Sequence, residues 1–129
     1  MKKQILYQST ITGIGDKVAE LLDGNMIVLF CDLIPEEMQE IAVTHKFDKP
    51  PHYNFRKGDI IQIGNQEFII EIVGSEVMHT FKGMGHLTIR YTADLNEDIP
   101  LLPGFVLAKF ASRPHIAIGD QLIISRIRE

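Results

Sequence analysis

The sequence predicts a small, mostly β domain, built as a β-barrel or a barrel-like sandwich with one or two short helices. Many short segments of strand length, either apolar or alternating, follow one another at close spacing between turn residues. The 129 residues, 45% hydrophobic and 23% charged, are typical of one soluble globular domain. We therefore expect a single domain over residues 1–129, with about seven strands.

The first elements are expected to be strand, helix and strand. Gln4 to Ile14 mixes apolar and hydroxyl residues in a period-2 pattern that Leu6 and Ser9 interrupt, which still favours a strand. A brief helix is expected over Lys17 to Leu22. The continuous apolar run Met26 to Cys31 predicts a strand that is buried on both faces.

A short helix is expected to begin at Pro35. Proline suits the first helical turn, and the two glutamates that follow suit its positive end. Three apolar residues then lie on one helical face, at i, i+3 and i+4: Met38, Ile41 and Ala42. Because the pattern turns polar at residue 44, we expect the helix to end before Lys46 and to release His45 into a solvent-exposed loop. Phe47 to Lys57, with two prolines and several charges, is expected to be a loop.

Strand patterns dominate the rest of the chain. Ile60 to Ile63 and Glu67 to Val73 flank the turn Gly64-Asn65, which predicts a β-hairpin. A helical turn is expected within Ser75 to Lys82. Further strands are expected at three places: Leu87 to Thr92, Gly104 to Phe110 and Gln121 to Ile127.

Composition excludes several classes of protein. The net charge of −4 argues against nucleic-acid binding, which calls for clustered lysine and arginine. The single cysteine, Cys31, cannot form an internal disulfide, so we expect a cytoplasmic protein. We expect no signal peptide and no membrane span, since no apolar stretch has the required length.

Two histidines are the strongest candidates for chemistry. An imidazole titrates near neutral pH, so a ring nitrogen can attack phosphorus. His45 lies between Thr44 and Lys46, which offer a hydroxyl group and a cation to phosphoryl oxygens. His86 follows Gly83-Met84-Gly85, where glycines let the backbone approach a ligand. Each is also compatible with a structural role: a solvated loop residue for His45, and a strand residue bonded to the backbone for His86.

Metal and cofactor sites are not expected. His52, His79 and His115 show no regular spacing with the other two histidines, and there is no clustered Cys/His pattern of the kind that binds zinc. The glycine pairs lack the context of a dinucleotide fingerprint or a P-loop.

Five segments spread over nearly the whole chain match one known family: Tyr7 to Gly15, Met26 to Phe30, Pro35 to His45, Val73 to Ser75 and Gly85 to Tyr91. On these segments the sequence resembles the glucitol/sorbitol-specific IIA component of the bacterial phosphoenolpyruvate-dependent sugar phosphotransferase system. Phe47 stands where some relatives carry another histidine.

The resemblance implies a β-rich cytoplasmic phosphoryl carrier for the uptake of glucitol, sorbitol or a similar polyol. In the family, the histidine after the acidic helix accepts phosphate from the phosphohistidine of HPr and passes it to a cysteine of the IIB component. That role carries over to His45. His86 is expected to lie near His45 and to support the phosphoryl group. Contact with the membrane is expected only through the IIB and IIC permease components.

The alternative is a noncatalytic regulatory or binding domain that retains the fold. A small metal-dependent enzyme is disfavoured because no ligand cluster is visible. The sequence leaves open which imidazole nitrogen is modified and whether the chain forms a homodimer.

Overall fold

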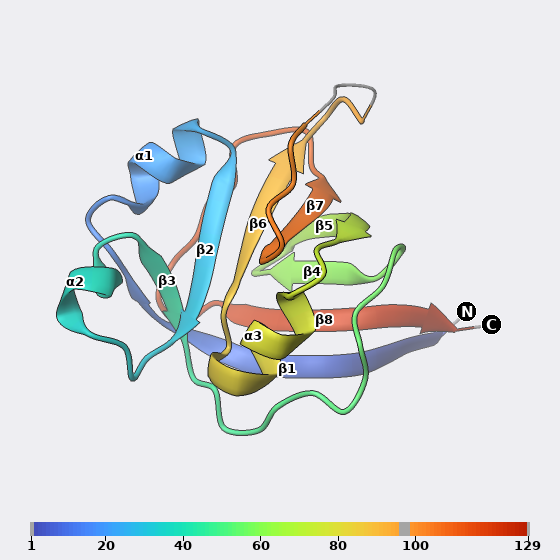
Figure 1. The fold of residues 1–129 in the computed structure, drawn as a ribbon, viewed down its shortest axis with the longest axis horizontal. Coiled ribbons are helices and arrows are strands. Elements are labelled where there is room, and N and C mark those ends of the chain that lie inside the picture. The colour runs from blue at the N-terminus through green and yellow to red at the C-terminus, as the bar shows by residue number, and fades with distance from the viewer. Residues whose placement is uncertain (1, 96–98, 129) are drawn as a thin grey trace.

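The computed structural model describes residues 2–95 and 99–128, in which eight strands form a closed barrel (Figure 1). The strands are β1 (Lys2–Ile14), β2 (Met26–Cys31), β3 (Ala42–His45), β4 (Ile60–Ile63), β5 (Gln66–Val73), β6 (Leu87–Thr92), β7 (Phe105–Lys109) and β8 (Gln121–Arg128). The helices are α1 (Val18–Asp23), α2 (Glu36–Gln39) and α3 (Val77–Met84). The prediction of a mostly β, barrel-like domain is confirmed.

The barrel closes in the order β1-β3-β2-β6-β7-β5-β4-β8. Most neighbours are antiparallel, but β2 pairs with β3 in parallel and β6 pairs with β7 in parallel. The first parallel pair needs a crossover connection, which contains α2. β1 is long enough to pair with both β3 and β8, so it joins the two ends of the strand order.

Alternate side chains of the strands fill the interior. In the hairpin, Ile61, Ile63, Phe68 and Ile70 are all fully buried and belong to one apolar cluster. α3 adds Val77 and Phe81 to the same cluster. The predicted hairpin is confirmed, since β4 and β5 pair directly across Gly64 and Asn65.

Two segments differ from the sequence prediction. The helix after Pro35 has a single turn, Glu36–Gln39, and Ala42–His45 is the strand β3 instead of a helix end and loop. Val43 and Thr44 are β-branched and favour extended backbone, and pairing with both β1 and β2 satisfies their peptide groups. The helical turn expected within Ser75 to Lys82 belongs to the eight-residue helix α3, which continues to Met84.

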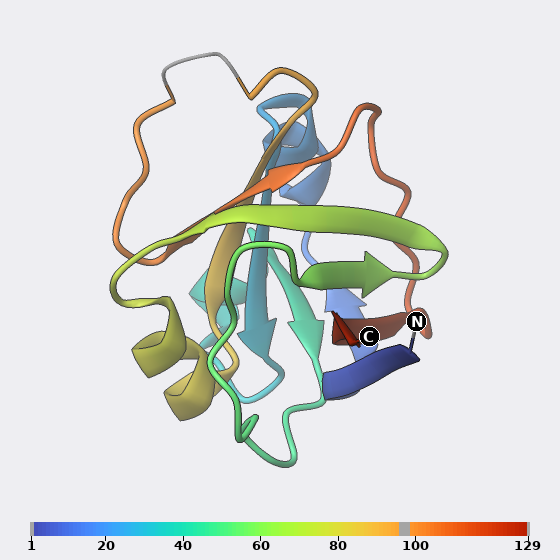
Figure 2. The same ribbon diagram turned by 90° about the vertical axis from the view of Figure 1, so that its right-hand side faces the viewer.

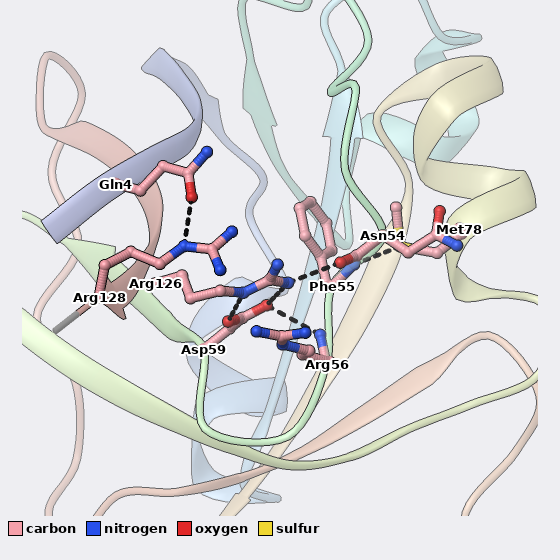
Figure 3. Close-up of polar contacts among 8 residues, drawn as sticks. All are labelled: Gln4, Asn54, Phe55, Arg56, Asp59, Met78, Arg126 and Arg128. Atoms are coloured by element: carbon pink, nitrogen blue, oxygen red, sulfur yellow. Dashed lines mark hydrogen bonds and ion pairs between the residues drawn. The ribbon is translucent and has the colours of Figure 1, made fainter.

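A buried ion pair anchors the loop of residues 46–59, which runs beside α3 (Figure 2), to β8 (Figure 3). The Arg126 guanidinium donates from Nε and Nη2 to the two Asp59 oxygens, both at 2.8 Å. Arg126 also donates to the Asn54 carbonyl, and the backbone N–H of Arg56 donates to Asp59 Oδ2. The Arg126 and Asp59 side chains are only 8% and 1% exposed, so the loop is held by charges that water does not screen.

Among the residues that the structure describes, no helix has the length and apolar character needed to cross a membrane.

Candidate functional site

His45 lies inside the barrel and is 0% exposed. It is the last residue of β3, where it pairs with Cys31 of β2. Its ring lies on the same side of the strand as Val43, a member of the buried cluster, because alternate strand residues share a face. The prediction that His45 is reachable from solvent at the end of a helix is wrong. The reason is that α2 ends at Gln39, and the chain then enters the sheet.

Both ring nitrogens of His45 have hydrogen-bond partners. Nε2 lies 2.8 Å from the carbonyl oxygen of Gly85. A carbonyl oxygen can only accept, so Nε2 carries the proton and donates. Nδ1 then carries the lone pair and accepts from the hydroxyl groups of Tyr7 and Ser9, each 3.0 Å away. The lone pair of the neutral ring therefore points at buried hydroxyl groups.

Aromatic rings surround His45. Phe81 stacks against the imidazole with ring centres 5.8 Å apart, and Tyr7 and Phe47 contact it edge to face. Burial lowers the pKa of His45 below its ordinary value, against the opposing effect of the Gly85 carbonyl. Burial likewise raises the pKa of Tyr7 to about 12, so its hydroxyl group stays protonated and able to donate.

The side chains that flank His45 do not face it. Thr44 lies on the opposite side of β3, where its hydroxyl group bonds Thr12 at 3.0 Å, and Lys46 is exposed. The expectation that both would contact a phosphoryl group on His45 is not met in this structure. What the sequence did not reveal is the contribution of Tyr7 and Ser9, which reach His45 from β1. The only signal was Ser9 itself, a polar residue on the otherwise apolar face of that strand.

His86 is partly exposed and lies directly after Gly85. Its ring stacks on Phe30, with centres 3.9 Å apart and planes 12° from parallel. Nδ1 lies 3.1 Å from the carbonyl oxygen of Leu29 and therefore donates its proton there. Burial lowers the pKa of His86, against the effect of that carbonyl, so the ring is neutral near pH 7. These contacts agree with the structural alternative for His86, a strand residue bonded to the backbone, and its support of a phosphoryl group stays a prediction.

Gly85 connects the two histidines. It ends α3 in the left-handed region, with φ of 62°, and its carbonyl accepts from His45. A Cβ at this position would lie 2.9 Å from the His45 ring, so only glycine allows this approach. The two residues are thus neighbours through one carbonyl group. Their rings, however, lie on opposite sides of the barrel wall, since His86 stacks on Phe30, which is outside the buried core cluster.

A cavity of about 630 Å³ borders α2 and the outer face of β3. Its charged lining is acidic: Asp16, Glu36, Glu37 and Glu40. These carboxylates would repel a phosphoryl group, so the cavity is not suited to hold one. The described part of the chain contains no group of three or more His, Cys, Asp and Glu side chains placed to bind a metal ion.

Comparison with known proteins identifies the family. The sequence profile of the PTS system glucitol/sorbitol-specific IIA component matches residues 6–123. The chain is 26% identical over 125 residues to the glucitol/sorbitol-specific EIIA components of Shigella flexneri and of Escherichia coli (strain K12), covering 97% of this chain and 98% of each relative.

The fold is also similar to a solved structure. The crystal structure of a PTS system IIA component from Enterococcus faecalis V583 superposes with a TM-score of 0.79 at 23% identity, covering 90% of this chain and 97% of that one. With its family profile matched from residue 6 to residue 123, this chain belongs to the glucitol/sorbitol-specific IIA component family of the sugar phosphotransferase system.

Proposed function

We propose that this chain is a phosphoryl carrier. It takes a phosphoryl group from the phosphohistidine of HPr and passes it to a cysteine of a IIB partner during the uptake of glucitol, sorbitol or a similar polyol. Family membership supports a role in phosphotransfer to sugars. The observation that carries the proposal is a pair of histidines, both with a pKa lowered by burial, that Gly85 connects: its carbonyl accepts from His45, and His86 is the next residue in the chain.

The chemistry needs little more than a positioned neutral imidazole. A lone pair on a ring nitrogen attacks phosphorus, and the resulting N-phosphoryl imidazole is reactive enough to be transferred again. Because phosphoryl transfer depends mainly on positioning and on stabilising charge, a rigid barrel that holds histidines by backbone carbonyls is a suitable carrier. Among residues 2–95 and 99–128, neither histidine has a carboxylate as a hydrogen-bond partner.

The assignment of the phosphohistidine to His45 rests on the family resemblance and stays a prediction. In the described conformation a donor protein cannot reach this ring, because it is 0% exposed. Phosphorylation at Nδ1 would require the ring to leave the hydroxyl groups of Tyr7 and Ser9. Phosphorylation at Nε2 would require loss of the bond to Gly85. Either route requires the cluster to open first.

A partner protein would dock where apolar side chains are exposed close to the histidine pair. Met84, at the end of α3, is 45% exposed and lies two positions before His86. Leu33, which follows β2, is 90% exposed, four positions beyond the Leu29 carbonyl that His86 contacts. Exposed apolar residues of this kind support a transient docking surface for HPr and for the IIB partner.

Phosphate transfer from phosphoenolpyruvate tests the proposal. The purified chain is incubated with labelled phosphoenolpyruvate, enzyme I and HPr, and a parallel sample omits HPr. We expect an HPr-dependent adduct that is labile in acid and stable in base, as a phosphohistidine is. A chain that stays unlabelled while HPr itself becomes phosphorylated would reject the carrier and leave a noncatalytic binding domain.

A further inference from the structure

The groups that enclose the buried His45 ring differ in how firmly the backbone holds them. Tyr7 and Ser9 belong to β1, which is paired with β8 at both positions. Phe81 lies in α3, and the Gly85 N–H at the end of that helix donates to the Phe81 carbonyl. Moving any of these four residues away from the imidazole would break strand pairing or the end of a helix.

Phe47, a further aromatic neighbour of His45, lies on a segment without such contacts. Residues 47–53, here called the gate segment, make no hydrogen bond and no ion pair with the part of the chain that the structure describes. In Figure 1 the segment is a bare green trace at the lower edge of the molecule. Phe47 is half-buried and Pro51 is buried, while the other residues of the segment are exposed. Apolar packing therefore holds the gate segment against the barrel.

The gate segment is fixed at both ends, so it can move as one piece. Before it, the Lys46 N–H donates to the Thr10 carbonyl at 3.0 Å. After it, the Asn54 carbonyl accepts from Arg126 at 2.8 Å, next to the buried ion pair. The two adjacent prolines inside the segment have restricted backbone angles and no N–H to leave unpaired. Opening the segment between these two ends therefore breaks no backbone hydrogen bond.

The Phe47 ring covers one edge of the imidazole. A Cβ built on Gly85 would lie 2.9 Å from Cε1 and Nε2 of His45 and 3.1 Å from Cδ1 of Phe47, so the two rings meet at this point. Phe47 also contacts the rings of Tyr7 and Phe81, with centres 5.9 and 5.8 Å apart. Those two rings are buried, whereas Phe47 is half-buried. Solvent therefore lies behind Phe47, on the side of the Cε1–Nε2 edge of His45.

On the basis of the proposed carrier function, we propose that Phe47 is a gate that controls access to His45. Its ring moves away from the barrel together with the gate segment, and the Cε1–Nε2 edge of the imidazole then meets the phosphoryl donor. β1, β3 and α3 keep their places, because their hydrogen bonds are not involved. The closed state shields the imidazole from solvent, and a docked partner shifts the population towards the open state by binding it better.

Chemical modification of His45 tests the gate without a partner protein. Diethyl pyrocarbonate acylates imidazole nitrogens that solvent reaches, and mass spectrometry assigns each modified histidine. In the native chain we expect slow modification of His45 and fast modification of the exposed His79 and His115, which serve as internal references. Phe47→Ala should raise the rate at His45 about tenfold and leave both references unchanged, because the rate follows the population of the open state. An unchanged rate at His45 in folded Phe47→Ala would overturn the gate.

Two further variants separate the gate from a general loss of stability. Phe110→Ala removes another half-buried phenylalanine, whose ring contacts Phe68 and Tyr91. It should leave the rate at His45 at the native value, and an increase equal to that of Phe47→Ala would overturn the proposal. Phe47→Leu keeps a smaller apolar cover and should give a rate between those of the native chain and Phe47→Ala.

The urea dependence of the native rate distinguishes local opening from global unfolding. Opening the gate segment exposes little surface, so the rate at His45 should rise only slightly with urea below the unfolding transition. If this rate instead rises as steeply as the unfolding equilibrium constant measured by circular dichroism, only global unfolding exposes the ring, and the proposal is wrong. This measurement also decides the matter if Phe47→Ala does not fold.

Labelling through HPr is measured on the same proteins and keeps the two proposals apart. If HPr labels neither the native chain nor Phe47→Ala, while the reagent shows the tenfold difference at His45, the carrier function is rejected and the gate stands. If HPr labels His45 of the native chain, while the reagent shows no difference between the two proteins, the gate is rejected and the carrier function stands.

Discussion

Replacing Gly85 by alanine probes the contact on which the candidate site depends. Gly85 ends α3 with φ of 62°, and its backbone N–H donates to the Phe81 carbonyl. An added Cβ would lie 2.9 Å from Cε1 and Nε2 of His45 and 3.1 Å from Cδ1 of Phe47. Both rings pack among core side chains, so neither can move aside freely.

The expected cost has two parts. A left-handed backbone costs a non-glycine residue about 1–2 kcal/mol. Forcing an extra methyl group into packed rings costs about 1–3 kcal/mol. Together they lower the free energy of unfolding by about 2–5 kcal/mol, a large part of the 5–15 kcal/mol typical of a small domain.

Two other glycines separate these parts. Gly58 also has positive φ, 92°, but no atom lies within 4 Å of an added Cβ, so Gly58→Ala should show the backbone cost alone. Gly83 lies in α3 and also has no atom within 4 Å of an added Cβ. Gly83→Ala should therefore raise the free energy of unfolding by about 0.5–1 kcal/mol, because alanine favours the helix.

Urea denaturation followed by circular dichroism measures all three variants. The midpoint concentrations should fall in the order Gly83→Ala, native chain, Gly58→Ala, Gly85→Ala. If Gly85→Ala is no less stable than Gly58→Ala, the His45 ring does not pack against Gly85, and the coupling of the two histidines is refuted.

Three further outcomes are expected. Arg126→Met leaves the buried Asp59 carboxylate unpaired and should lower the free energy of unfolding by about 3–5 kcal/mol, measured by urea denaturation; a loss below about 1 kcal/mol would show that water reaches the pair. Because burial depresses the pKa of His45, stability should be fully present above about pH 6.5, the unfolded value, and fall as pH drops from there through the lower folded pKa. Urea denaturation measured between pH 7.5 and 5 should show this fall in the free energy of unfolding. If the folded His45→Gln variant shows the same fall, His45 is not its cause. Tyr7→Phe and Ser9→Ala should each lower the free energy of unfolding by no more than about 1 kcal/mol, since the remaining hydroxyl group can still donate to His45 Nδ1. The double variant should lower it by about 1–3 kcal/mol. If the losses of the two single variants simply add up in the double variant, the two hydroxyl groups do not share one acceptor.

Elements specified by local chemistry agree with the sequence prediction. The hairpin of β4 and β5 follows from the turn at Gly64 and Asn65 between apolar runs, and pairing across it needs only neighbouring residues. The apolar run also predicted the strand β2 correctly, but its burial on both faces is only partial: Ile27, Leu29 and Phe30 are buried, whereas Met26, Val28 and Cys31 are half-buried. Such elements can be predicted because turn geometry and burial act within a few residues.

Strand β1 shows where the pattern fails and why. The period-2 pattern placed Ile5 with Tyr7 and Ile11, yet Ile5 is 56% exposed while Leu6 and Tyr7 are both buried. A shift in the pairing of β1 with β8 between Ile5 and Tyr7 causes the difference. The interruption at Leu6 marked this irregularity, but only the partner strand determines which side chains then point inward.

The sequence by itself determined a β-rich single domain and picked out His45 and His86, because periodicity, turn residues and residue chemistry are local properties. The tertiary structure decided that residues 42–45 join the sheet, since a strand between β1 and β2 exists only once the chain has brought both together. It also decided the state of each imidazole. Which nitrogen carries the proton and which meets solvent depends on the carbonyl groups of Gly85 and Leu29, and these reach the two rings only through contacts 40 and 57 positions apart in the chain.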